Sequence, residues 1–238
     1  MENIEIISSP DKEVGQENNF EALVEFFAPV ETHQLCYSSL NLVNSFFKSF
    51  NWKVYPIGGS MLGAKRYGGL IPWDADVDLI CESLSYAKEE ELTEFILSSN
   101  PNLEVKRKLW DGRRPGLQIR TKKKLRVVID IFYGIIRDGM IYSLGTNIVN
   151  FPKQGRQGID KLEVSGEKNW ESFGPSEICI PSESACNDYL LWKFGPNWND
   201  EYSIFSQDHS YKSQLQIASD SFTDKSIQSW IEGLKEEK

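Results

Sequence analysis

Two carboxylates at alternate positions are the first feature of this sequence that could do chemistry. Asp76 and Asp78 alternate with Val77 and Leu79 in the segment ADVDLIC, a pattern typical of a strand that carries both carboxylates on one face. Two carboxylates on one buried face require a cation to neutralise them, and hard divalent cations prefer carboxylate and phosphate oxygens. The spacing therefore predicts a divalent-metal site, although an Asp-x-Asp pair is also common at a solvated strand end.

A third carboxylate comes from a different segment. Asp130 is the only acid in the apolar run LRVVIDIF and shares a strand face with Val128 and Phe132. Because an unpaired buried carboxylate is strongly unfavourable, we expect Asp130 to join the metal site. The alternative is a buried aspartate that pairs with an arginine or caps a loop.

Glycines cluster just before the aspartates. Five of them lie within twelve residues, at Gly58, Gly59, Gly63, Gly68 and Gly69. A glycine turn that opens a helix presents free backbone N–H groups to a phosphate. Gly58, Gly59 and Ser60 are therefore candidate phosphate ligands, although a Gly-Gly-Ser after a strand is often only a turn.

Basic residues are concentrated in one segment of an acidic chain. Residues 106–126 contain ten basic side chains and one acid, whereas the whole chain has a net charge of −9. The net charge disfavours nucleic acid as a partner. Arg113 and Arg114, in a predicted loop, are candidate ligands of an anionic substrate, whereas the lysines at 122–124 are expected to be a solvated turn.

The elements that must position these residues follow from the hydrophobic spacing, which predicts a mixed α/β (α+β) fold with helices packed on a central sheet. Helices are predicted at 20–27, 31–50, 84–99, 183–194 and 227–234, the fourth capped by Ser182. Strands are predicted at 52–59, 75–81, 116–120 and 125–136, the last two forming a hairpin around TKKK.

The same spacing assigns individual side chains. Phe50 is expected on the buried stripe of the second helix and Tyr86 on the inner side of the third. Trp73 is expected to pack in the core. His33 and His209, the two histidines of the sequence, are expected at the surface.

The 238-residue chain contains no repeat or composition break, so we expect one domain at 19–238 after a flexible tail at 1–18. No apolar run is long enough to span a bilayer, and the polar start lacks the features of a signal peptide. A cytoplasmic chain without a transmembrane segment is therefore expected. The widely separated cysteines are expected to be reduced, buried thiols, at Cys36, Cys81, Cys179 and Cys186.

The segment from Gly59 to Asp78 resembles the signature of the LicD phosphocholine-transferase family, typically GTLLGAVRHGGFIPWDDDID, which fukutin and fukutin-related protein share. The family's DIF strand is matched at 130–132, and its carboxy-terminal segment is recognisable at 173–198. Among the departures from the signature, Ser60 replaces Thr, Lys65 replaces Val and Ala75 replaces the middle Asp.

The resemblance implies a nucleotidyltransferase-type domain in which a G-S turn holds nucleotide phosphates and three aspartates hold Mg²⁺ (or Mn²⁺). The implied phosphate ligands are Gly59, Ser60 and Arg66, next to the candidate Gly58 of the glycine turn. The implied metal residues are Asp76, Asp78 and Asp130 together with Asp74. Asp130 is also the expected catalytic base. Residues 106–126, including Arg113 and Arg114, would face the donor diphosphate or an anionic acceptor.

The implied activity is a metal-dependent phosphotransfer. Phosphocholine or a polyol phosphate would pass from a CDP-activated donor to a hydroxyl of a glycan or glycolipid, with release of CMP, at a site in peripheral contact with the inner face of a membrane. Two alternatives stay open at this stage. One is a nucleotidyltransferase that moves NMP from an NTP, and the other is a non-catalytic binding module of the same fold.

Overall fold

The computed structural model describes residues 27–110, 113–144, 161–199, 201–205 and 214–218. The predicted tail at 1–18, the first predicted helix except for its last residue, the helix predicted at 227–234 and His209 lie outside this part. The division into a tail and one domain stays a prediction.

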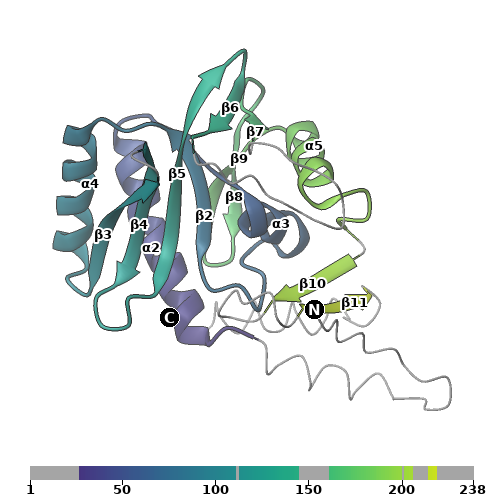
Figure 1. The fold of residues 1–238 in the computed structure, drawn as a ribbon, viewed down its shortest axis with the longest axis horizontal. Helices are drawn as coiled ribbons and strands as arrows, with labels where there is room; N and C mark the ends of the chain where they lie inside the picture. Colours follow the sequence, from purple (N-terminus) through teal and green to yellow (C-terminus); the bar gives the residue numbers. More distant parts are fainter. Residues whose placement is uncertain (1–26, 111–112, 145–160, 200, 206–213, 219–238) are drawn as a thin grey trace.

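A mixed sheet of seven strands forms the centre of the described fold (Figure 1). Its order is β1-β2-β5-β4-β3, with β6 beside β5 and β7 beside β6. The strands are β1 (Val54–Pro56), β2 (Val77–Glu82), β3 (Leu103–Trp110), β4 (Arg113–Thr121), β5 (Val127–Arg137), β6 (Met140–Ser143) and β7 (Lys161–Glu163). β2 and β5 pair in parallel, and the other neighbours pair antiparallel. The predicted mixed α/β fold and the hairpin around TKKK are confirmed.

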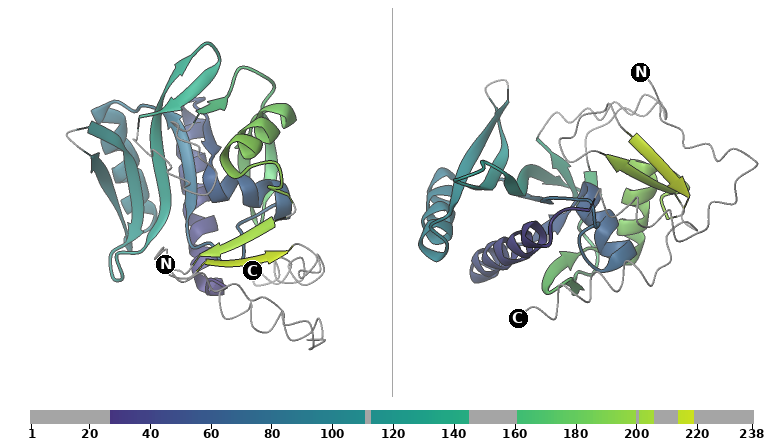
Figure 2. Two further views of the ribbon diagram at one scale, coloured as in Figure 1. Left: turned by 45° about the vertical axis from the view of Figure 1, so that its right-hand side comes forward. Right: turned by 90° about the horizontal axis from the view of Figure 1, so that it is seen from below.

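Two helices, α2 (Val30–Ser49) and α4 (Tyr86–Ser99), cover one face of this sheet (Figure 2). The expected inward place of Phe50 is wrong, because α2 ends at Ser49 and leaves Phe50 38% exposed. The expectation for Tyr86 is also wrong. Tyr86 is the first residue of α4 and is 59% exposed, whereas Glu89, one turn later, is buried and accepts hydrogen bonds from Arg107 and Tyr133.

The other described elements lie outside the seven-stranded sheet. They are α3 (Gly58–Tyr67), β8 (Asn169–Phe173), β9 (Ser176–Ile180), α5 (Glu183–Phe194), β10 (Glu201–Phe205) and β11 (Gln214–Ala218). β9 contacts β1 and α2, and α5 contacts α3. As predicted, α5 begins after a Ser182 cap, whose hydroxyl accepts from Ala185 N–H at 3.3 Å.

The buried core contains residues of α2 to α5 and of β1 to β9. Trp73 is buried, which confirms its predicted packing, and its ring centroid lies 6.4 Å from that of Phe27. All four cysteines are free and buried, as predicted. Among the described helices, none combines the length and the apolar composition needed to cross a bilayer.

Candidate active site

Three aspartates meet at the start of the parallel pair β2 and β5. Asp78 is the register partner of Asp130, and Asp76 comes directly before β2. One carboxylate oxygen of each residue lies within 4.8 Å of those of the other two. The structure thus brings together the three side chains that the sequence analysis selected as metal ligands.

The donor set fits a divalent cation. Three carboxylates are the ligands that Mg²⁺ and Mn²⁺ prefer. Within the described residues, Asp130 Oδ1 is buried and has no hydrogen-bond partner, which is unfavourable unless a cation or another group contacts it. This cluster of Asp76, Asp78 and Asp130, called the acidic triad below, is therefore consistent with a metal site.

Burial and repulsion between neighbouring carboxylates raise the pKa of Asp78 and of Asp74. Burial raises the pKa of Asp78 well above its usual value, and the neighbouring charges of Asp76 and Asp130 raise it further, whereas Lys108 opposes the shift. Burial and Asp76 likewise raise the pKa of Asp74, against a hydrogen bond from the backbone N–H of Ala75. A bound cation would relieve both effects, because it stabilises the charged carboxylates.

The N-terminus of α3 lies against these carboxylates. Ser60 is buried, and its hydroxyl accepts a hydrogen bond from Asp78 N–H at 2.8 Å. A Cβ atom added at Gly59 would lie 2.5 Å from Asp74 Oδ2, and one at Gly58 would lie 3.3 Å from Asp78 Oδ2. Glycine is therefore required at both positions if the N-terminus of α3 is to approach the aspartates. The positive end of the helix dipole favours negative charge at this place.

The predicted phosphate turn already has protein partners. Gly58 N–H donates to the hydroxyl of Tyr189 at 2.8 Å, and Ser60 is engaged with Asp78. Phosphate binding by Gly58, Gly59 and Ser60 stays a prediction, and the structure adds that α5 holds this turn through Tyr189.

Helix α2 holds the loop that carries the aspartates. His33 Nε2 hydrogen-bonds the carbonyl oxygen of Asp74 at 2.7 Å, and Cys36 Sγ donates to that of Ala75 at 3.3 Å. The surface position predicted for His33 is wrong, because His33 is fully buried on the helix face that it shares with Cys36 and Tyr37. Burial lowers the pKa of His33 to about 4, so the ring is neutral at pH 7 and its Nε2–H is the donor.

Lys108 is a residue of the site that the sequence analysis did not select. Its Nζ lies 2.6 Å from Asp130 Oδ2, so Asp130 has a basic partner, as in the alternative interpretation of the sequence, but this partner is a lysine and not an arginine. The sequence could have indicated Lys108 through the alternation of β3, which places Lys106 and Lys108 on one face of the sheet and Arg107 on the other. Arg107 pairs with Glu89 of α4 instead.

The remaining predicted ligands come from the ends of other elements. Arg66 lies in the last turn of α3, at the opposite end of the helix from the glycine turn. Arg113 and Arg114 are the first residues of β4, so the loop predicted for them is wrong. Their side chains are outside the described part of the structure, and contacts of these three arginines with a substrate stay predictions.

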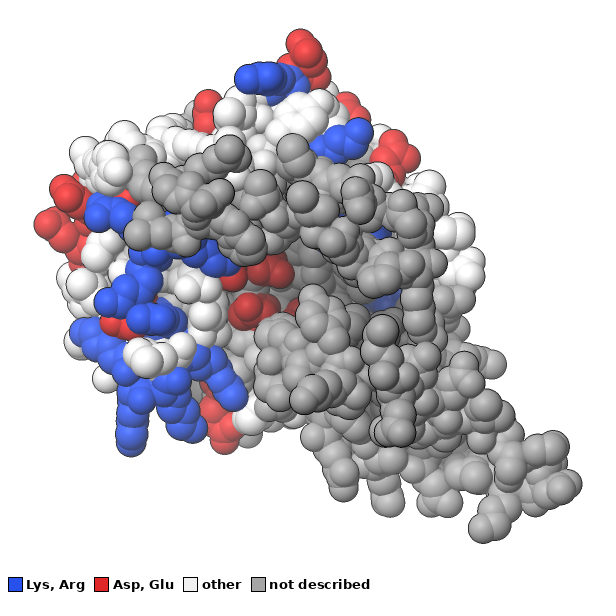
Figure 3. Space-filling view, in the orientation of Figure 1, with Lys and Arg blue, Asp and Glu red and all other residues white. Residues whose placement is uncertain are grey.

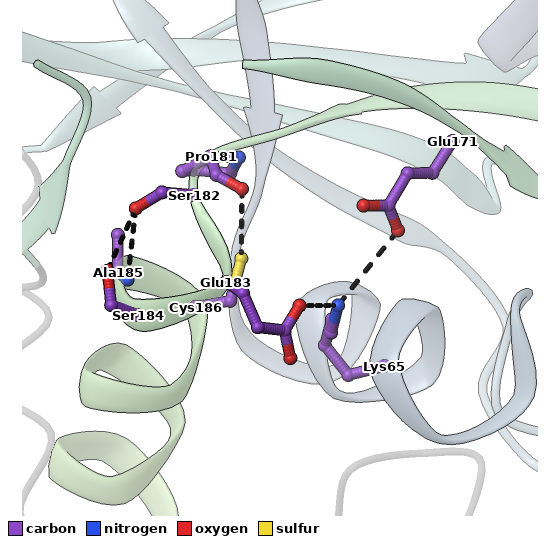
Figure 4. Close-up of polar contacts among 8 residues, drawn as sticks. All are labelled: Lys65, Glu171, Pro181, Ser182, Glu183, Ser184, Ala185 and Cys186. Carbon is purple, nitrogen blue, oxygen red and sulfur yellow. Dashed lines mark hydrogen bonds and ion pairs between the residues drawn. The ribbon is translucent and has the colours of Figure 1, made fainter. Parts of the chain in front are cut away.

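Lys65, one of the departures from the family signature, ties α3 to the segments that follow residue 160 (Figure 4). Its Nζ lies 2.5 Å from Glu183 Oε2 of α5 and 4.0 Å from Glu171 Oε2 of β8. Burial alone would lower the pKa of Lys65, but Glu183 and Glu171 outweigh it, so the pKa lies above its usual value. The ion pair thus helps to hold α5, and with it Tyr189, beside the glycine turn.

The charges divide across the face shown in Figure 3. Acidic atoms gather near its centre, and basic atoms cover the part over β3, β4 and β5, at the left of the view. The segment 106–126, which carries ten basic residues, runs through β3 and β4. A negatively charged substrate at the acidic triad would therefore have cationic side chains on one flank.

Comparison with known proteins gives one family. Residues 51–158 match the family model described as LicD/FKTN/FKRP, nucleotidyltransferase domain, which confirms the resemblance inferred from the sequence. The matched part includes the glycine turn, the acidic triad and Lys108, whereas α2 and α5 lie outside it. The comparison with curated proteins returned no match.

Proposed function

We propose that this chain, whose residues 51–158 belong to the LicD/FKTN/FKRP nucleotidyltransferase domain family, transfers phosphocholine or a polyol phosphate from a CDP-activated donor to a glycan or glycolipid hydroxyl. Membership of this family implies a transferase of phosphorus-containing groups that uses a nucleotide-activated donor. The observation that carries the proposal is the acidic triad, in which three carboxylate oxygens lie within 4.8 Å of one another at the start of β2 and β5.

The reaction needs positioned charge rather than a covalent intermediate on the protein. The acceptor oxygen forms a bond to the phosphorus of the transferred group, the phosphoanhydride bond breaks, and CMP leaves with the bonding electrons. A divalent cation held by Asp76, Asp78 and Asp130 would neutralise charge on the phosphate oxygens. The proton of the acceptor hydroxyl passes to a carboxylate of the triad, for which Asp130 is our choice.

Nucleotidyl transfer from an NTP is a second candidate, favoured by the nucleotidyltransferase description of the matched family. The same carboxylates would serve either reaction, because both are in-line attacks on phosphorus and a cation that these carboxylates held would neutralise the phosphate oxygens. The products differ. Phosphotransfer from a CDP donor releases CMP, whereas nucleotidyl transfer from an NTP releases pyrophosphate.

The experiment measures both products. The purified chain is incubated with Mg²⁺ or Mn²⁺, a panel of glycan acceptors, and CDP-choline, CDP-ribitol, CDP-glycerol or an NTP, with Asp78→Asn as the inactive control. Acceptor-dependent CMP formation that Asp78→Asn abolishes is the expected result. Pyrophosphate from NTPs alone would replace the proposal by nucleotidyl transfer. Binding of a donor, seen as a raised melting temperature, with neither product formed on any acceptor would favour the non-catalytic module.

A further inference from the structure

Strand β3 brings one lysine to the acidic triad. The ammonium of Lys108 lies 2.6 Å from Asp130 Oδ2 and 4.1 Å from the centroid of the Phe132 ring. In the sheet register Lys108 is opposite Gly116 of β4, and Gly116 is opposite Phe132 of β5. Lys108 thus reaches across β4, at a position where that strand has a glycine, to contact β5.

The lysine and a metal would use different oxygens of Asp130. Lys108 contacts Oδ2, whereas the buried Oδ1 has no hydrogen-bond partner among the described residues. Oδ1 is thus the atom available to a cation, and the ion pair does not block the metal site. It does add a positive charge beside three carboxylates, which lowers their attraction for a further cation.

The charges of the site change when a donor binds. The three carboxylates and Lys108 together carry a formal charge of −2, so a divalent cation brings the site to neutrality. A diphosphate then adds negative charge next to Asp130, and an ammonium on that carboxylate is close enough to contact a phosphate oxygen instead. Lysine suits such an exchange, because its ammonium is a compact charge on a flexible stem.

We propose that Lys108 is a ligand of the donor diphosphate. In the chain without substrate, the Lys108 ammonium is paired with Asp130 Oδ2 instead. On binding of metal and diphosphate, the ammonium moves from the carboxylate to a phosphate oxygen. The exchange leaves Asp130 Oδ2 free to accept the proton of the attacking hydroxyl. This inference rests on the proposed function, since it assigns a specific contact to the same donor site.

The competing interpretation is a purely structural ion pair that orients Asp130. Removal of Lys108 then weakens metal binding and diphosphate binding together, because a misplaced carboxylate impairs both. Our proposal predicts that the substitution has opposite effects on metal binding and on diphosphate binding. Metal binding is maintained or strengthened, because a competing cation has gone, whereas diphosphate binding is weakened.

The test uses Mn²⁺ and inorganic pyrophosphate as probes in isothermal titration calorimetry on the full chain. Lys108→Met is compared with the wild type and with Lys88→Met. The control is closely matched, because Lys88 also lies 2.6 Å from a carboxylate, that of Glu91, and over the ring of Phe50, but it belongs to α4 on the opposite face of the sheet.

We expect Lys108→Met to bind Mn²⁺ at least as tightly as the wild type and to bind pyrophosphate, at saturating Mn²⁺, at least tenfold more weakly. Lys88→Met should match the wild type in both titrations. Unchanged pyrophosphate affinity in Lys108→Met, weakened Mn²⁺ binding, or no pyrophosphate binding by the wild type would each overturn the proposal. If Lys108→Met is unfolded at the working temperature, Lys108→Gln is measured against the same criteria.

The probe contains no cytidine, so the result does not depend on the identity of the donor. The proposed function is wrong if the product assay yields no CMP, whatever affinity for pyrophosphate the calorimetry measures. The assignment of Lys108 fails on its own if CMP is formed while the pyrophosphate affinity of the variant is unchanged.

Discussion

Asp78 and Asp130 are register partners on the parallel strands β2 and β5. Residues opposite each other in a sheet point to the same face, so the pairing places two carboxylates side by side although 52 positions separate them in the sequence. A slip of one residue would send one carboxylate to the face covered by α2 and α4. The acidic triad is therefore a consequence of the strand register.

Replacing Asp78 by Asn should abolish most divalent-cation binding while the fold is retained. The substitution removes one ligand and also removes repulsion from a carboxylate whose pKa is raised by burial, Asp76 and Asp130. We expect the melting temperature in EDTA to be unchanged or higher, and the increase caused by Mg²⁺ to disappear. Asp138→Asn, an exposed change at the turn after β5, is the control. A wild-type Mg²⁺ affinity in Asp78→Asn would exclude the metal site.

Replacing Asp130 by Ala should lower turnover by about two orders of magnitude or more, with only a modest change in donor affinity. A group that accepts the proton of the attacking hydroxyl acts chiefly in the transition state, so its loss reduces kcat rather than binding. Steady-state kinetics with the CDP donor measures kcat and KM separately. A variant with normal kcat and a raised KM would show that Asp130 serves ground-state binding alone.

Replacing Gly59 by Ala should weaken donor binding about tenfold or more. The new Cβ would lie 2.5 Å from Asp74 Oδ2, so either the carboxylate or the start of α3 must move. Gly166→Ala, where the added Cβ meets only Ser182 at 3.5 Å, is the matched control. Calorimetry with the donor and, separately, with Mn²⁺ should show the larger loss for the donor. Equal donor affinity in the two variants would mean that the turn does not approach the phosphates.

Acidification should destabilise the fold through His33. Burial holds its pKa at about 4 in the folded chain, against 6.5 when unfolded, so the unfolded chain binds the proton first as the pH falls. The contribution to the free energy of unfolding is complete above pH 6.5 and is lost towards pH 4, by roughly 3 kcal/mol in total. Urea unfolding at several pH values should show a flatter dependence in His33→Gln, whose side-chain amide can still donate to Asp74. If the free energy of unfolding depended on pH equally in the wild type and in His33→Gln, His33 would not be a buried neutral group.

Replacing Tyr189 by Phe should lower the free energy of unfolding by about 1–2 kcal/mol, because Gly58 N–H loses its acceptor in a part-buried position. The loss should also weaken donor binding if α5 holds the glycine turn in place. Tyr142→Phe, a partly buried tyrosine of β6, controls for the loss of a hydroxyl. Full stability in Tyr189→Phe would show that the turn holds its position without α5.

Local patterns were sufficient for several features of the site. Alternation identified the strands of Asp78 and Asp130, with Asp76 directly before β2, and turn chemistry identified the hairpin around TKKK. These features depend on neighbours within a few residues, whose periods of two and 3.6 are visible in the sequence. Arg113 and Arg114 show the limit of that approach, because a Pro-Gly pair suggested a loop, whereas strand β4 begins at Arg113, which pairs with Trp110 of β3.

The sequence by itself determined which residues could do chemistry, namely three aspartates of strand spacing and a glycine turn before them. Only the tertiary structure decided how they are held. Lys108 reaches Asp130 across a glycine of the intervening strand, His33 is buried against the Asp74 loop, and Gly58 donates to Tyr189. Each of these contacts joins residues far apart in the chain. Their existence depends on sheet order and on the packing of α2 and α5, which are long-range consequences of burying one common core.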